Sequence, residues 1–298
     1  MGGVFDACLD LMLGSSCAVC GLPGRLVCDV CVTDLPGGAE VCWPTPCPAG
    51  LALPMAAGEY DGPLQALVNA HKERRQFSLA RPLGLLLAQS VRELVERTPQ
   101  PGDGGAGGWI LVPVPSRGHV VRARGHDPLL RVTRHAAGVL RRLGHPVVVM
   151  TLLQSCAVAR DQSGLGADER AANLSGTMRA RSRPVLRLGR RWAGARLVVT
   201  DDVLTTGSTA REAQRALEHE GLTVAGIATV AATRRRLAPG AALRLPGDHY
   251  RFPTETASVY AWSPSGSVVA SAGSPVEPRV LRGHVPASRS QSQAKRST

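Results

Sequence analysis

The chain has 298 residues, 44% of them hydrophobic and 3% aromatic, and a formal net charge of +12. That length suits one medium domain with appendages or two small domains, and the apolar fraction is large enough for a packed core. No apolar run reaches the length of a membrane-spanning helix, so no membrane span is expected. The residues before Cys17 include Asp6 and Asp10 but no Lys or Arg, which does not fit a signal peptide. We therefore expect a cytoplasmic protein.

Cysteines are concentrated near the start of the chain, where six of the eight lie between positions 17 and 47. Cys17 and Cys20 form one C-x-x-C pair, and Cys28 and Cys31 form a second after a turn that contains Gly and Pro. Two such pairs can direct four thiolates at one tetrahedral ion, and zinc suits a structural site of four sulfurs. So short a segment buries little apolar surface, so the metal would supply its folding energy. We predict a module over residues 1–50 with structural Zn²⁺ on these four cysteines.

Other states of these cysteines are disulfides, reduced thiols or a redox-active C-x-x-C. A cytoplasmic chain disfavours disulfides, and a redox motif needs no second pair. Cys42 and Cys47 are separated by four residues that include two prolines, and they either replace one of the pairs or are free thiols. Cys8 and Cys156 stand apart and are expected to be buried apolar residues.

Strand and helix patterns alternate along the middle of the chain. In order they predict a strand within 51–60, helices at 62–72 and 78–97, a strand at 109–112, a helix at 128–143, strands at 147–149 and 197–200, a helix at 208–220 and a strand at 224–232. Alternation of this kind predicts an α/β domain with a parallel sheet flanked by helices, which we place at residues 51–240. Scarce aromatic residues fit such a sheet, whose core is built from Ala, Val and Leu.

The most informative stretch is 198–209, where a buried apolar strand ends in Asp201 and Asp202 and a loop rich in hydroxyl groups leads into a helix. Loop amides and a helix N-terminus offer unpaired N–H groups and a positive dipole end to a phosphate. Hydroxyl donors and a glycine without Cβ complete such a site, which comprises Thr205, Thr206, Gly207, Ser208 and Thr209. The two acids would accept hydrogen bonds from ribose hydroxyls and stabilise positive charge on the sugar ring. The alternative is an acidic turn that starts an ordinary helix.

A second loop follows the strand predicted at 109–112. Prolines at positions 113 and 115 fix a rigid turn, Ser116 and Arg117 could hold a second anion, and Arg124 follows within a few residues. The alternative is a polar surface turn with solvated arginines.

The last part of the chain, residues 241–298, is predicted to be a largely disordered basic tail. From about position 263 it is rich in Ser, Pro, Gly and Arg, with five basic residues against the single acid Glu277. A net charge of +12 favours polyanionic partners or substrates. The tail is therefore either a solvated segment without a role or an arm that binds nucleic acid.

Together these motifs resemble the ComF/GntX family of competence-associated, phosphoribosyltransferase-like proteins. The resemblance runs from Cys17 to Arg234, with the motifs in the family's order. His126-Asp127-Pro128 departs from the Phe-Asn-Gln that the family usually has at that place. The resemblance rests on the two C-x-x-C pairs, Tyr60-Asp61-Gly62-Pro63-Leu64 through Lys72, Val112-Pro113-Val114-Pro115, Arg124-Gly125, the spaced set Arg160, Gln162, Leu165, Arg170, Asn173 and Gly176, and the phosphoribosyl-pyrophosphate (PRPP) motif Asp201-Asp202-Val203-Leu204-Thr205-Thr206-Gly207-Ser208-Thr209.

The resemblance implies a type I phosphoribosyltransferase fold preceded by a zinc-ribbon-like module. It implies that Asp201 and Asp202 hold the ribose hydroxyls and act in catalysis, while residues 205–209 hold the 5-phosphate. The turn at 114–117 would face the pyrophosphate together with Mg²⁺, which neutralises the leaving group. Arg160 and Arg170 would lie in a glycine-interrupted segment that closes over the substrate. Arg170 could instead form a structural pair with Asn173 on a helix surface.

Two functions remain open from the sequence. The first is an enzyme that binds PRPP-Mg and transfers phosphoribosyl to an acceptor that the sequence does not identify, with a link to DNA uptake. The second is a non-catalytic accessory protein that binds single-stranded DNA during uptake or recombination. The zinc module, the net charge and the tail favour the second function, whereas scarce aromatic residues disfavour it because base stacking usually needs them.

Overall fold

The computed structural model describes residues 16–74, 76–98, 108–116, 127–156, 176–186, 194–233, 260–262 and 268–270. Its helices are α2 (Asp29–Thr33), α3 (Gly62–Glu73), the short 3-10 helix η1 (Phe77–Leu79), α4 (Ala80–Arg97), α6 (Pro128–Arg142), α8 (Ser182–Leu186) and α9 (Ser208–Glu218). Its strands are β1 (Glu40–Val41), β2 (Pro54–Glu59), β3 (Trp109–Pro113), β4 (Val147–Val149), β5 (Leu153–Ser155), β6 (Met178–Ala180), β7 (Arg196–Leu204), β8 (Val224–Ala232), β9 (Tyr260–Trp262) and β10 (Val268–Ala270).

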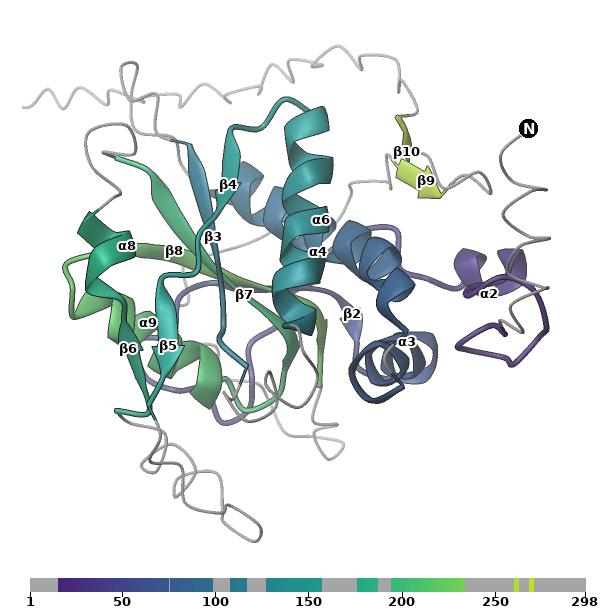
Figure 1. Cartoon of the computed structure of the whole chain (residues 1–298), viewed down its shortest axis with the longest axis horizontal. Helices are drawn as coiled ribbons and strands as arrows, with labels where there is room; N and C mark the ends of the chain where they lie inside the picture. Colours follow the sequence, from purple (N-terminus) through teal and green to yellow (C-terminus); the bar gives the residue numbers. More distant parts are fainter. Residues whose placement is uncertain are drawn as a thin grey trace, which may run out of the picture.

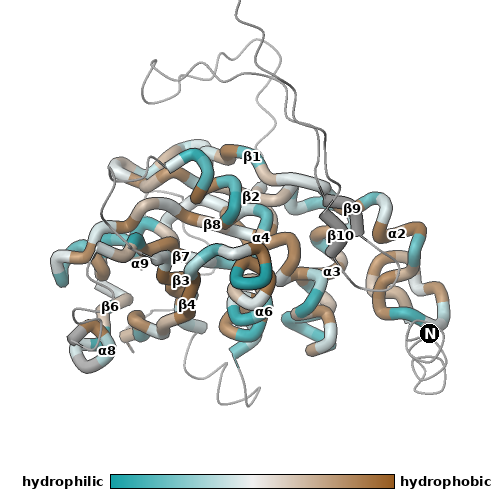
Figure 2. Tube along the Cα trace, turned by 90° about the horizontal axis from the view of Figure 1, so that it is seen from above, coloured by the Kyte–Doolittle hydropathy of each residue, from teal (hydrophilic) through white to brown (hydrophobic). Residues whose placement is uncertain are grey.

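Six strands form one sheet in the order β1-β2-β8-β7-β3-β4. The edge strand β1 runs antiparallel to β2, and every other neighbouring pair is parallel. Helices α4 and α6 cover one face, whereas α9, α8 and the separate antiparallel strand pair β5–β6 lie on the other side (Figure 1, Figure 2). The predicted α/β class, a mostly parallel sheet flanked by helices, is therefore confirmed.

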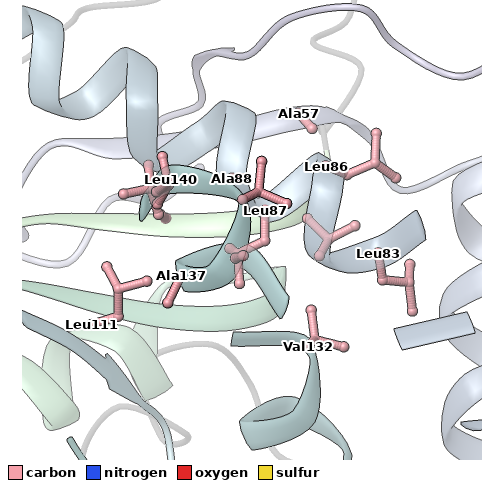
Figure 3. Close-up of a cluster of buried hydrophobic side chains, with 14 of the residues drawn as sticks. Ala57, Leu83, Leu86, Leu87, Ala88, Leu111, Val132, Ala137 and Leu140 are labelled. Carbon is pink, nitrogen blue, oxygen red and sulfur yellow. The ribbon is translucent and has the colours of Figure 1, made fainter. Parts of the chain in front are cut away.

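Both faces of the sheet are apolar, because successive strand residues point to opposite faces. On β3, Trp109 and Leu111 belong to the core beneath α4 and α6, whereas Ile110 and Val112 belong to the core beneath α9. Burial on both faces explains why the central strands are continuous apolar runs. Figure 3 shows part of the core between α4, α6 and the sheet, including Leu87, Leu111, Ala137 and Leu140.

Most of the predicted elements are present. β4 and β8 have the predicted bounds, the helix expected at 78–97 begins as η1 and continues as α4, and the others differ by a few residues at their ends. The sequence analysis missed α2, β1, β5, β6 and α8. Each has only two to five residues, too few to show a periodic pattern.

The predicted strand 197–200 was too short. It was expected to end at Thr200, before the acids, but β7 extends through Asp201 and Asp202 to Leu204. β8 explains the difference, because it runs beside β7 as far as Ala232, the register partner of Leu204. The backbone of both acids therefore has a neighbouring strand, and the two carboxyl groups belong to the last part of a strand instead of a loop.

Among the described residues, no helix is long and apolar enough to cross a membrane. Within the predicted tail, 241–298, the described residues form the antiparallel hairpin β9–β10. Two short strands are thus present in a segment for which none was predicted, and the rest of the tail lies outside the described residues.

Candidate functional site

The parallel strands end at a common edge of the sheet. The N–H of Tyr60, just after β2, bonds to the Ala232 carbonyl of β8 at 2.8 Å. The N–H of Val114, just after β3, bonds to the Thr200 carbonyl of β7 at 3.0 Å. In open parallel sheets, ligands bind beyond the carboxyl ends of the strands. The segments that follow β2, β3, β7 and β8 are therefore the candidates for a binding site.

Asp201 and Asp202 lie half-buried at this edge. Lys72 Nζ forms an ion pair with Asp202 Oδ2 at 2.6 Å, and the N–H of Asp202 donates to Asp201 Oδ1 at 2.8 Å. Burial and the neighbouring Asp202 carboxylate raise the pKa of Asp201 to about 8, against the opposing effect of Lys72. Burial lowers the pKa of Lys72, but the Asp202 charge outweighs it and the pKa is raised. The Asp201 carboxyl is therefore harder to ionise than an ordinary aspartate, and Lys72 stays charged beside Asp202.

Lys72 is a site residue that the sequence analysis did not identify as one. It lies in the last turn of α3, which is fixed at the sheet edge by contacts on either side. Tyr60 donates its hydroxyl proton to Asn69 Oδ1 at 2.9 Å, and His71 Nε2 lies 3.4 Å from the Pro128 carbonyl at the start of α6. The signal available in the sequence was the position of Lys72 in the motif that begins at Tyr60.

The loop after β7 turns tightly into α9. Thr206 Oγ1 and Ser208 Oγ lie 3.0 Å apart, and Gly207 has a φ of 72°, in the left-handed region that glycine favours. Gly207 is the N-cap of α9 and has no side chain, so it takes none of the first N–H groups of the helix. Thr205 is exposed, and Thr206 and Thr209 are partly exposed. The loop can therefore present both N–H and hydroxyl donors to an anion.

One side of this loop is closed by a segment that we call the proline segment (residues 44–51), which precedes β2. A Cβ placed on Gly207 would lie 2.9 Å from Pro44 Cγ, 3.2 Å from Leu51 Cδ2 and 3.3 Å from Pro48 Cδ. Glycine is thus required here both by its backbone conformation and by the close approach of the proline segment.

The side chains of α9 hold the proline segment in place. Arg211 Nε donates to the Ala49 carbonyl at 2.9 Å. Gln214 Nε2 donates to the Gly50 carbonyl at 2.9 Å, and Gln214 Oε1 accepts from the N–H of Ala52 at the same distance. The helix that begins at the candidate phosphate loop therefore also fixes the segment that covers the loop.

The same helix, α9, also holds the antiparallel strand pair β5–β6. Glu212, which is buried, accepts from the Met178 N–H at 2.9 Å and pairs with Arg215 Nε at 2.6 Å. Arg215 Nη2 in turn donates to the Met178 carbonyl at 3.1 Å. Both backbone groups of Met178 are thereby satisfied by α9.

Ser116, which follows β3, is the remaining described member of the predicted substrate site. Its hydroxyl donates to Asp127 Oδ1 at 3.2 Å, and the same oxygen accepts from the Leu130 N–H to cap α6. Ser116 thus ties the end of β3 to the start of α6. The structure brings Ser116, Asp201, Asp202 and residues 205–209 to one edge of the sheet. The other predicted substrate-binding residues, Arg117, Arg124, Arg160 and Arg170, lie outside the described residues.

The four predicted metal ligands converge. The sulfur atoms of Cys17, Cys20, Cys28 and Cys31 all lie within 4.8 Å of one another, and those of Cys20 and Cys28 are 3.6 Å apart. A tetrahedral zinc with Zn–S bonds of about 2.3 Å separates its sulfurs by about 3.8 Å, so this set fits a zinc ion. Among the described residues it is the one group of cysteine, histidine or acidic side chains with such spacing.

Backbone amides support thiolate character in this cluster. Burial raises the pKa of Cys17, but hydrogen bonds from nearby backbone N–H groups lower it to about 6. One of these is donated by Cys28 N–H to Cys17 Sγ at 3.4 Å. Burial raises the pKa of Cys31 in the absence of metal, and a bound cation would oppose that effect. Helix α2, which follows Cys28 and contains Cys31, lies at the α3 side of the molecule, away from α9 (Figure 1).

No family model matches the chain, and a search among curated proteins also gives no match. What the site does must therefore be argued from its geometry. The hypothesis of single-stranded DNA binding stays a prediction, because most of the basic tail lies outside the described residues.

Zinc content tests the cysteine cluster. We expect about one zinc per chain by mass spectrometry of the metal, and loss of most of it in Cys31→Ser, because a structural site needs all four thiolates. Cys47→Ser is the matched control: Cys47 Sγ contacts the Pro48 carbonyl at 3.6 Å and belongs to no such cluster among the described residues, so zinc should be retained. Full zinc in Cys31→Ser, or none in the unmodified chain, would contradict the assignment.

The packing around the loop predicts different costs for two glycine substitutions. Gly207 and Gly221 share a φ of 72°, but a Cβ on Gly221 meets nothing within 4 Å. Gly221→Ala should cost about 1–2 kcal/mol in the free energy of unfolding, the penalty of the left-handed backbone. Gly207→Ala should cost about 1–3 kcal/mol more, because it also displaces Pro44 and Leu51. Urea denaturation measures the loss in the free energy of unfolding for both variants. Equal losses would show that the proline segment does not press on the loop.

Proposed function

We propose that the chain is a phosphoribosyltransferase-like protein that binds PRPP with Mg²⁺ and transfers its phosphoribosyl group to an acceptor. The observation that carries the proposal is the arrangement at the end of β7: two half-buried acids are followed, after Val203 and Leu204, by a tight loop of hydroxyl residues and the N-terminus of α9. The location at the carboxyl edge of a parallel sheet supports it. The resemblance of the motifs to the ComF/GntX family points to the same chemistry.

In this proposal the loop binds the 5-phosphate of the sugar. The N–H groups at the start of α9 and the hydroxyls of Thr205, Thr206 and Thr209 donate to the phosphate oxygens. Asp202, and Asp201 when ionised, accept hydrogen bonds from the ribose hydroxyls. The sugar thus lies between the strand end and the loop, with its anomeric carbon directed away from the phosphate.

The reaction breaks the bond between the anomeric carbon and the pyrophosphate oxygen, and the bonding electrons leave with pyrophosphate. A bond then forms from an acceptor atom to the same carbon, and the acceptor loses a proton. Positive charge develops on the ribose ring in between, and preorganised carboxylates nearby stabilise it. Mg²⁺ bound with PRPP would neutralise the leaving pyrophosphate. The zinc of the cysteine cluster has a structural role in this scheme.

Calorimetric titration with PRPP and Mg²⁺ tests the proposal. The unmodified chain should bind, and Asp201→Asn/Asp202→Asn should lose at least about tenfold in affinity, because hydrogen bonds to a charged acceptor contribute roughly 1.5–3 kcal/mol each. With a competent acceptor, pyrophosphate should be released by the unmodified chain and not by the double variant.

Asp34→Asn is the control for this experiment. Asp34 is an exposed residue at the end of α2, so the same chemical change there should leave PRPP affinity unchanged. The proposal fails if the unmodified chain shows no Mg²⁺-dependent binding of PRPP, or if the double variant binds as tightly.

A further inference from the structure

The end of β7 raises an electrostatic difficulty. Two acids lie only two residues before the loop that would bind an anion, and carboxylates repel phosphates. If both Asp201 and Asp202 were ionised with no cation beside them, they would put two negative charges next to the sugar-phosphate. The site therefore needs something that reduces the charge of this strand end before a polyanion can approach.

The structure contains such a group in Lys72. Its ammonium lies 2.6 Å from Asp202 Oδ2, and the two side chains keep only 32% and 22% of their surface exposed. Partial burial weakens solvent screening, so the pair interacts more strongly than an exposed ion pair does. The ion pair joins α3 to β7, although β8 lies between β7 and β2, the strand that leads into α3.

We propose that Lys72 is a positioning residue that neutralises and holds the twin aspartates, so that an acidic strand end can lie beside an anion-binding loop. This inference rests on the proposed function for the identity of the anion, a sugar phosphate. Asp202 and Lys72 form a pair without net charge, and the raised pKa of Asp201 lessens the negative charge that this second acid adds. The anion can then bind to the loop with less electrostatic repulsion from the end of β7.

The position of Lys72 is fixed by contacts at both ends of the last turn of α3. Asn69 accepts from Tyr60, and His71 contacts the Gln76 carbonyl at 3.2 Å and the Pro128 carbonyl at 3.4 Å. The ammonium is therefore held at the strand end by the fold and not only by its attraction to Asp202. The charged and titratable groups that act on the pair from neighbouring elements include Tyr60 after β2 and Asp201 on β7.

The first measurement follows the charge without any ligand. Carbon-13 NMR of the aspartate carboxyl groups gives the titration midpoint of Asp201 in the full chain. In Lys72→Gln the midpoint should move to higher pH by about one unit or more, because a cation within a few ångströms that favoured ionisation has gone. In Lys72→Arg, which keeps the charge, it should stay close to that of the unmodified chain. An unchanged midpoint in Lys72→Gln would overturn the inference.

The second measurement uses inorganic phosphate as the probe, because it can occupy the loop without needing the ribose contacts. Lys72→Gln should weaken phosphate binding at least about tenfold at low salt, because it removes one unit of positive charge close to the loop near a protein surface. In Lys72→Gln/Asp202→Asn, which removes both charges, affinity should return close to that of the unmodified chain. If the double variant stays weak, Lys72 contacts the ligand directly and the inference is wrong. Absence of phosphate binding to the unmodified chain would also overturn it.

The two measurements separate this inference from the proposed function. If the NMR midpoint moves and the double variant recovers phosphate binding, yet the unmodified chain does not bind PRPP, the proposed function fails and the role of Lys72 stands. If PRPP binds to the unmodified chain and Lys72→Gln alters neither readout, the function stands and the role of Lys72 fails. Circular dichroism melting of each variant confirms that it is folded.

Discussion

Placing two carboxyl groups at the end of a central strand is the constraint on which the candidate site depends. A half-buried carboxylate loses much of its hydration, and a second one next to it adds repulsion. Three features offset this cost: the Lys72 ion pair, the hydrogen bond from the Asp202 N–H to Asp201 Oδ1, and the raised pKa of Asp201. The ladder with β8 supplies the remaining support, because it fixes the backbone of both acids.

Helix α9 turns this strand end into a site. The helix begins at the loop, so its first N–H groups face the same edge as the acids. Two of its side chains, Arg211 and Gln214, hold the proline segment against Gly207. Two others, Glu212 and Arg215, hold the antiparallel strand pair β5–β6. A loop held by these contacts needs little reorganisation when it binds an anion, and a preorganised site of this kind favours affinity.

The sequence predicted those features that depend on neighbouring residues and missed those that depend on contacts across the fold. The apolar run of β8, the loop 205–209 and the paired C-x-x-C spacing are local patterns, and each predicted element is present. The length of β7 was underestimated because Asp201 and Asp202 look like a strand end unless the partner strand is known. The ion pair of Lys72, the hydrogen bond of Ser116 to Asp127 and the contact of Pro44 with Gly207 join distant parts of the chain, and no periodicity encodes them.

One continuous stretch of the chain connects the cysteine cluster to the proline segment, which lies against the loop of the candidate site. Val19 and Val27 pack against the cysteines and also against the core beneath α4 and α6, so the cluster is packed onto the α/β domain. From there the chain forms β1, which pairs with β2, and the N–H of Cys42 bonds to the Pro54 carbonyl at 3.0 Å before the proline segment begins. The pairing of β1 with β2 and the hydrogen bonds from α9 hold the proline segment at both ends. The loop after β7 is therefore supported directly by the sheet and by α9. A metal bound to the four cysteines would act on the loop only indirectly, by ordering the segment that leads into β1.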